Sequence, residues 1–152
     1  MSTIKQIVGA RNSLAYTGSA LSTLASATYV ANTTAYDCTT NQPVDVIIDV
    51  VAATTNTPSG NKQLVVFVIE SLDGTNYRSG PTSGTTTTRE PNLKYVGVVP
   101  LTTASTTEEA TFSLLQALGY IPAKFSIVIK NDLGVALTAG TVFTSEISNT
   151  VA

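Results

Sequence analysis

One run of residues constrains the fold of this chain more than any other: residues 63–74, QLVVFVIESLDG. From residue 64 to residue 69 both alternating sets of side chains are apolar, so a β-strand formed here must be covered on both faces. Residues 71–74 then favour a turn, because Asp73 can bond its own backbone and Gly74 supplies a positive φ. We therefore expect a central strand here, with the rest of the chain supplying its cover.

The composition indicates one β-rich domain that packs against neighbours. The chain has 152 residues, of which 43% are hydrophobic and 12% charged, whereas about 25% are charged in typical soluble proteins. This length suits a single domain with its own core. Because so few charges leave little electrostatic repulsion between copies, we predict a homo-oligomer.

Charge and cysteine content exclude several classes of protein. The net charge is −2 and the eight basic residues are scattered, so we expect no direct nucleic-acid binding. No run approaches the roughly 18 apolar residues of a membrane span, and the N-terminus lacks the apolar stretch of a signal peptide. Cys38 is the only cysteine. Because no disulfide can form within the chain, folding in a reducing compartment is favoured, with Cys38 as a small hydrophobe.

The first 25 residues differ from the rest of the chain. They are small and polar, with apolar side chains scattered among them at Ile4, Ile7, Val8, Leu14, Leu21 and Leu24. Two alternatives stand open for residues 1–25: an extended N-terminal arm, or a first strand folded back on the domain. Residues 26–152 are expected to form a β-sandwich domain.

Short strand patterns separated by turns follow along the chain. They lie at residues 27–36, 43–52, 64–69, 93–101, 107–113, 122–130 and 141–147, with a short helical turn at 114–118. A helix over residues 106–119 is the alternative for that part of the chain, since Thr106 and Glu109 match a capping box and Gly119 can end a helix. The strand from residue 43 buries Val46 and Ile48 and is expected to turn Asp45 and Asp49 to water. The turn-rich residues 54–62 suggest a hairpin between this strand and the central one. The pattern predicts an all-β fold, a jelly-roll-like antiparallel sandwich of two sheets.

Two further features carry expectations of their own. Residues 75–90 are a long loop rich in Gly, Ser, Thr and Pro, which makes this loop a candidate contact region. Gly97 lies inside an apolar strand and indicates a bulge or a close approach of another group.

No catalytic arrangement is evident in the sequence. The chain has no histidine, which excludes Ser-His and Cys-His nucleophile pairs and zinc sites with histidine ligands. We interpret Asp45 and Asp49 as a solvated strand face, and the oxygens of residues 73–76 as a turn, not a calcium site. The sequence therefore predicts a protein that is not an enzyme and needs no metal or cofactor.

Two stretches carry a resemblance to a known family. They are residues 66–81, VFVIESLDGTNYRSGP, and residues 114–137, LLQALGYIPAKFSIVIKNDLGVAL. The matching positions are Asp73, Gly74, Thr75, Tyr77, Gly119, Pro122, Lys124, Phe125, Asn131, Asp132, Gly134 and Leu137. In these positions the chain resembles small structural proteins of tailed bacteriophage virions, of the capsid decoration (cement) type.

The resemblance implies a non-enzymatic protein that stabilises the phage head by bridging subunits of the major capsid protein. It places the chain on the capsid surface of the virion, assembled in the host cytoplasm. The candidate partner contacts are Ile4, Ile7 and Val8 near the N-terminus, and Tyr77 and Arg78 in the long loop.

Two alternative functions stay open. One is a tail or connector component of the virion. The other is a receptor- or carbohydrate-binding module on the particle surface that binds through residues 75–90, although the absence of tryptophan makes it less favoured.

Overall fold

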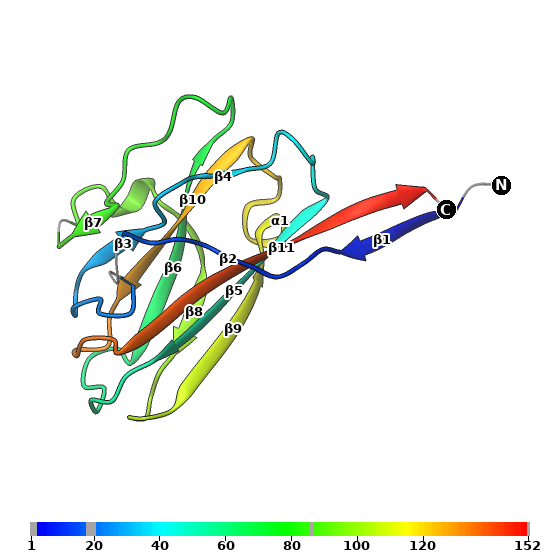
Figure 1. The fold of residues 1–152 in the computed structure, drawn as a ribbon. Helices are drawn as coiled ribbons and strands as arrows, with labels where there is room; N and C mark the ends of the chain where they lie inside the picture. Colours follow the sequence, from blue (N-terminus) through cyan, green and yellow to red (C-terminus); the bar gives the residue numbers. More distant parts are fainter. Residues whose placement is uncertain (1–2, 18–20, 86, 152) are drawn as a thin grey trace.

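The computed structural model, which describes residues 3–17, 21–85 and 87–151, is nearly all β. Two antiparallel sheets pack face to face, and a pair of strands extends beyond them to one side (Figure 1). The prediction of an all-β fold with two antiparallel sheets is therefore confirmed.

The first sheet is built around the last strand of the chain. Its order is β1-β11-β5-β9, and β2 also pairs with β11. The bounds are β1 Ile4–Val8, β2 Asn12–Ser13, β5 Asp45–Ala53, β9 Thr107–Ser113 and β11 Ala139–Val151.

The second sheet has the central strand predicted from the sequence. Its order is β7-β3-β10-β6-β8, and β4 also pairs with β10. The bounds are β3 Tyr29–Ala31, β4 Tyr36–Asp37, β6 Gln63–Ser71, β7 Ser83–Gly84, β8 Lys94–Pro100 and β10 Lys124–Asn131. A 3₁₀ turn, η1 (Glu90–Asn92), precedes β8, and α1 (Leu114–Leu118) follows β9.

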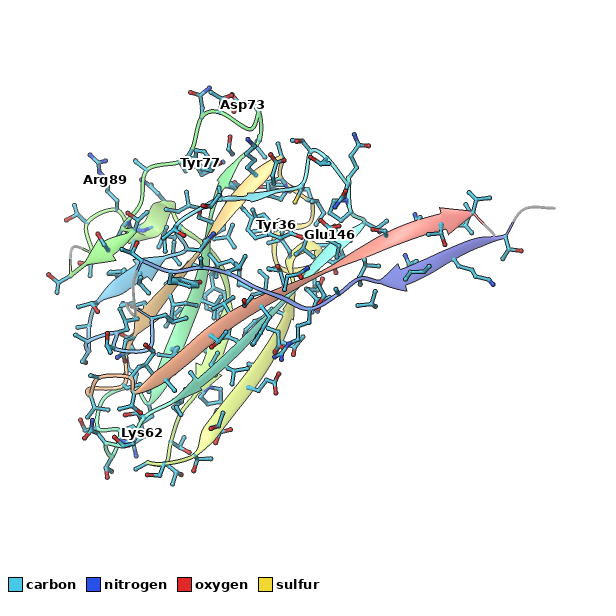
Figure 2. The ribbon with its side chains drawn as sticks, viewed as in Figure 1. Tyr36, Lys62, Asp73, Tyr77, Arg89 and Glu146 are labelled. Carbon is cyan, nitrogen blue, oxygen red and sulfur yellow. The ribbon has the colours of Figure 1, made fainter. Side chains whose placement is uncertain are left out.

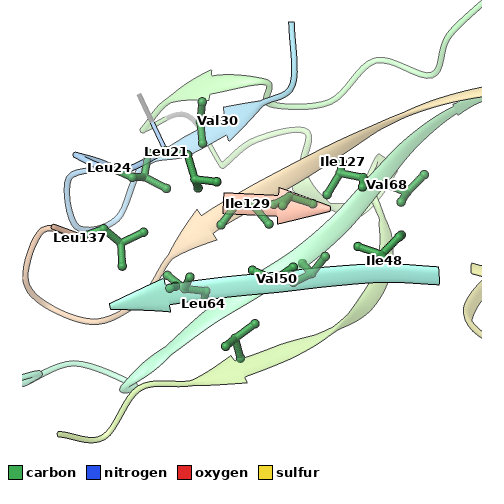
Figure 3. Packing of buried hydrophobic residues seen from close by; sticks show 14 of the residues in the cluster. Leu21, Leu24, Val30, Ile48, Val50, Leu64, Val68, Ile127, Ile129 and Leu137 are labelled. Carbon is green, nitrogen blue, oxygen red and sulfur yellow. The ribbon is translucent and has the colours of Figure 1, made fainter. Parts of the chain in front are cut away.

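Strand β6 is buried on both faces, as its sequence requires. It lies between β10 and β8. On its inner face Leu64, Val66 and Val68 are fully buried in the main core between the sheets. Figure 3 shows Leu64 and Val68 among the other core residues. On its outer face Val65, Phe67 and Ile69 belong to a second apolar cluster with Tyr29, Leu93 and Val128. The segment between β6 and β8 supplies part of this outer cover, because Leu93 at its end is a member of the cluster.

The strand pairs are nested along the sequence. The earliest strands, β1 and β2, pair with the last strand β11; β3 and β4 pair with β10; β5 pairs with β9; and β6 pairs with β8. The suggested hairpin between β5 and β6 is therefore wrong, since these strands lie in opposite sheets. The physical reason is that each has a strongly apolar inner face, and the two faces bury each other across the sandwich.

The N-terminal 25 residues combine exposed and buried parts. Strand β1 pairs with the far end of β11, and β2 pairs with Phe143 and Thr144 of the same strand. Leu21 and Leu24 lie in the main core, only 3% and 6% exposed. The chain thus enters the sandwich core by residue 21.

The strand and helical turn predicted for residues 107–118 are confirmed. The side chain of Ser113 accepts a hydrogen bond from the backbone N–H of Gln116, 3.0 Å away, and so begins α1. Gly119, with φ of 82°, ends the helix in the left-handed conformation that glycine favours.

Gly97 marks a close approach of the two sheets. The register between β6 and β8 shifts at Val66/Phe67, next to the position that pairs with Gly97. A Cβ atom at Gly97 would lie 2.7 Å from Cδ1 of the Phe112 ring. Both the bulge and the close approach expected from the sequence are therefore present.

We predict that Gly97→Ala lowers the free energy of unfolding by about 1 to 3 kcal/mol, because the added methyl group overlaps the Phe112 ring. Urea unfolding measures the change. In a chain that already carries Phe112→Leu the same substitution should cost clearly less, because the two positions are in contact. Equal costs in both backgrounds would show that this contact is not the cause.

Candidate functional site

A two-stranded ribbon projects from the first sheet. The pairing of β11 with β5 stops at Ile147 opposite Asp45, but β11 continues to Val151. Beyond that point β11 pairs with β1 alone, from Val8 opposite Ile147 to Ile4 opposite Val151. Figure 1 shows this pair leaving the body of the molecule. We call residues 4–8 and 147–151 the projecting ribbon.

The projecting ribbon exposes apolar side chains. Every residue of β1 is exposed, and Ile4, Val8 and Val151 have exposed fractions of 69%, 65% and 74%. A two-stranded ribbon without a packed face is marginally stable by itself. Exposed apolar groups gathered on such an element mark an interaction surface.

The two faces of the projecting ribbon differ. Residues directly opposite each other in an antiparallel pair point to the same face. One face therefore carries two apolar pairs, Ile4 with Val151 and Val8 with Ile147, which flank the amides of Gln6 and Asn149. The other face carries Lys5 with Thr150 and Ile7 with Ser148. The first face is thus the more apolar one.

The edges of the projecting ribbon are open. Within the described ranges, no strand pairs with the outer side of β1 or with residues 148–151 on the side away from β1. An open edge offers backbone N–H and C=O groups to an incoming strand. The ribbon therefore combines an apolar face with two free edges.

The base of the projecting ribbon is held on the sandwich by Glu146. The Tyr36 hydroxyl donates to Oε1 of Glu146 and the Asn41 side-chain amide donates to Oε2, each at 2.9 Å. The Gly9 N–H donates to the Glu146 carbonyl at 2.7 Å. Figure 2 shows Tyr36 and Glu146 where the ribbon leaves the sandwich. These contacts fix where the ribbon begins.

The other two candidate contacts lie elsewhere, on the segment that covers the second sheet. The side-chain Nε of Arg78 donates to Glu70 at 3.0 Å, and the Tyr120 hydroxyl donates to the other oxygen of Glu70 at 2.6 Å. Glu70 is only 1% exposed, whereas Tyr77 is 41% exposed. The structure therefore brings Ile4, Ile7 and Val8 together on the ribbon and places Tyr77 and Arg78 at a separate surface.

The sequence reasoning missed the partner half of the projecting ribbon. It ended the last strand at Ile147, because the next three residues are polar. The alternation of Phe143, Ile147 and Val151 on one face of β11 was the available signal. Glu146 fixes the base of the projecting ribbon, and Glu70 fixes Arg78. No local sequence pattern indicates either role, because most of the hydrogen-bond partners of these glutamates lie far away in the sequence.

The carboxylates considered as acid or base groups are engaged in structural contacts. Asp45 is buried, so its expected exposure to water is wrong: it accepts hydrogen bonds from the Ser113 hydroxyl and from the Leu115 N–H at 2.8 Å. Asp45 is buried because the end of β9 and the first turn of α1 lie against it. The Ser113 hydroxyl and the Leu115 N–H in these elements need an acceptor, and Asp45 provides it. Asp49 forms an ion pair with Arg11 and accepts a hydrogen bond from Thr111.

The oxygen-rich residues 73–76 form a turn. Asp73 accepts hydrogen bonds from the N–H groups of Thr75 and Asn76, each at 2.8 Å, and from the Asn76 side chain. These donors hold the pKa of Asp73 well below its usual range. Among the described residues no group of three or more His, Cys, Asp or Glu is placed to hold a metal ion. In the same part of the chain no helix has the length and apolar character to cross a membrane.

Comparison with known proteins identifies no relative of this chain: no family model, no curated protein and no solved structure matches it. The resemblance to tailed-phage virion proteins therefore stays a prediction.

We predict that stability falls as the pH rises above about 10. Burial raises the pKa of three tyrosines. The pKa of Tyr29, which also donates a hydrogen bond to Glu90, rises to about 12, and the pKa values of Tyr16 and Tyr36 rise further. The unfolded chain ionises its tyrosines near pH 10, whereas the folded chain keeps them neutral. Each such tyrosine therefore lowers the free energy of unfolding by up to about 1.4 kcal/mol per pH unit above that point. Urea midpoints between pH 8 and 11.5 measure the slope. Tyr16→Phe should reduce it, and an unchanged slope would contradict the assignment.

We predict that Cys38 reacts slowly with a disulfide reagent in the folded protein. The thiol is buried in the main core, and burial followed by the nearby Glu146 and Asp37 carboxylates raises its pKa to about 12. At pH 8 little thiolate forms, and the thiolate is the reactive species. Reaction with dithionitrobenzoate at pH 8 should be at least about 100-fold slower than in urea-unfolded protein. Similar rates in both states would contradict this burial.

Proposed function

We propose that this chain is a non-enzymatic structural protein of a tailed-bacteriophage virion, a capsid decoration (cement) protein that bridges subunits of the major capsid protein. The single observation that carries the proposal is the projecting ribbon, with its exposed Ile4, Val8 and Val151. An element with this exposure is stabilised when a neighbour covers it. The resemblance of residues 66–81 and 114–137 to such proteins supplies the biological setting.

The sandwich in this proposal is a jelly roll. The nested pairing of β2 with β11, β4 with β10, β5 with β9 and β6 with β8 supports it, because a folded-over antiparallel ribbon of eight strands gives a jelly roll. The even distribution of these strands over two sheets supports it too.

The ribbon strand β1 acts as the docking arm of the N-terminal segment. Its free edge can accept a strand of the capsid subunit through main-chain hydrogen bonds, while the apolar face of the ribbon is buried. Because Glu146 holds the base of the ribbon, less freedom is lost on docking than with a disordered arm.

Assembly on the shell supplies the remaining stability. The low charge of the chain permits copies to sit close together, so homo-oligomers form on the capsid surface. Neighbouring copies on the capsid lattice then bind at several points at once. Weak individual contacts therefore give a high overall avidity, because each bound contact raises the effective concentration for the next. In this role the protein is a mechanical link between subunits, assembled in the host cytoplasm.

We predict that the double variant Ile4→Thr/Val8→Thr binds capsids stripped of this protein at least about tenfold more weakly than the unchanged chain. Threonine keeps the strand preference of β1 but removes apolar area from its docking face. Co-sedimentation with stripped capsids of the parent phage measures the affinity. Both residues are exposed, so the free energy of unfolding should change by less than about 1 kcal/mol in all.

The matched control is Leu72→Thr, which removes a side chain of similar exposure, 63%, from the loop over the second sheet. This variant should bind as the unchanged chain does. Unchanged binding of the double variant, and of a chain lacking residues 1–12, would remove the ribbon from the interface. Immunogold labelling of virions tests the location, and a signal confined to the tail would replace decoration by a tail or connector role.

A further inference from the structure

A depression lies beside Tyr77 and Arg78 on the outer side of the second sheet. Its volume is about 370 Å³, and residues that line it include Thr33, Ile69, Tyr77, Arg78, Thr82 and Ser126. Small-ligand sites in proteins are commonly about 300 to 1,000 Å³. Figure 2 shows Tyr77 toward the end of the molecule that is far from Lys62.

Arg78 is fixed in place by a buried carboxylate. Its backbone N–H donates to the Glu70 carbonyl at 3.3 Å, and its side-chain Nε donates to Glu70 Oε1 at 3.0 Å. Glu70 is itself fixed by the Tyr120 hydroxyl. In the described part of the chain no group accepts from the terminal nitrogens of Arg78, whose side chain is 52% exposed. The guanidinium therefore presents two terminal nitrogens with free N–H donors in a fixed plane, the geometry that a carboxylate matches in a bidentate pair.

The rest of the depression suits a sugar ring. Tyr77 offers an aromatic surface, and Ile69 supplies an apolar contact. Thr82 and Ser126, whose hydroxyl groups can donate and accept hydrogen bonds, are among the lining residues. An aromatic ring, an apolar contact and several hydroxyls together complement the mixed apolar and polar faces of a pyranose.

Charge decides which kind of sugar fits. Arg78 is the only charged residue among the described residues that line this depression. On the other side of Tyr77 and Arg78 a second depression is lined by two acids, Glu70 and Asp73. Arg78 also lines this second depression, where it pairs with Glu70. Of the two, only the first depression therefore offers a cation with no acid among its described lining residues, which favours an anionic group there.

We propose that the depression beside Tyr77 and Arg78 binds a saccharide that carries a carboxylate. The carboxylate pairs with the terminal nitrogens of Arg78, and the sugar ring packs on Tyr77. This site does not rest on the virion role or on the projecting ribbon, since it belongs to a different surface of the chain. The free protein should therefore bind the sugar whether or not it binds a capsid.

The test is a titration of the isotope-labelled full chain with sodium D-glucuronate, followed by backbone amide shifts in NMR spectra. D-Glucose, which lacks the carboxylate, and inorganic phosphate are titrated in parallel at equal ionic strength. We expect saturable shifts around Tyr77 and Arg78 with glucuronate, and at least tenfold weaker binding of glucose and of phosphate. Glucose binding as tightly as glucuronate would overturn the role of charge. Phosphate binding as tightly would overturn the saccharide assignment.

Two variants test the assigned contacts. Arg78→Lys keeps a cation beside Glu70 but removes the two-pronged donor, and Tyr77→Ala removes the ring from an exposed position. Each should weaken glucuronate binding at least fivefold. The matched control is Arg89→Gln, which removes an exposed arginine of the same segment that does not line the depression. If Tyr77→Ala, checked for an unchanged urea midpoint, binds glucuronate as the unchanged chain does, the site is overturned.

Discussion

The rest of the structure depends on the burial of strand β6 on both faces. Its inner residues meet the apolar face of β5 across the sandwich, and its outer residues need a separate cover. Tyr29 of β3 supplies part of that cover, and Leu93 at the end of the segment between β6 and β8 supplies another part, so this segment lies against the second sheet. Glu70 at the end of the same strand fastens Arg78 of this segment. One apolar strand thus determines where the long loop lies and which of its side chains remain at the surface.

The projecting ribbon, in contrast to β6, leaves its apolar side chains exposed. Main-core packing along β11 ends near Thr144, the last residue of the strand that is buried. Beyond Ile147 neither β5 nor the second sheet reaches the strand, and only β1 pairs with it. Hydrogen bonds to β1 satisfy one edge, but they bury no apolar area to match that of the sandwich. The surface expected to need a partner therefore begins where the two-sheet core stops.

Much of the local structure could be predicted from the sequence, because local signals determine it. The strand at residues 107–113 and the helical turn after it were expected from the sequence, and in the structure Ser113 and Gly119 cap that turn. Pairing over long distances could not be predicted: the partnership of β1 with the end of β11, and the separation of β5 from β6, depend on which faces meet in three dimensions. Asp45 was misjudged for the same reason, since its donors come from residues 113 and 115. For the candidate contacts, the sequence indicated exposed apolar residues near the N-terminus but not the strand that orients them.

The pairing of Ile4 with Val151 has a practical consequence for handling this protein. Because these residues are partners, both ends of the described chain meet at the tip of the projecting ribbon (Figure 1). A fluorophore or affinity tag joined to either end would sit at the same spot, remote from the sandwich. Such a label reports on, and can obstruct, whatever contacts the tip. A short peptide joining Ile4 to Val151 would fit this geometry, so a circularly permuted chain could carry its labels in the link between β5 and β6.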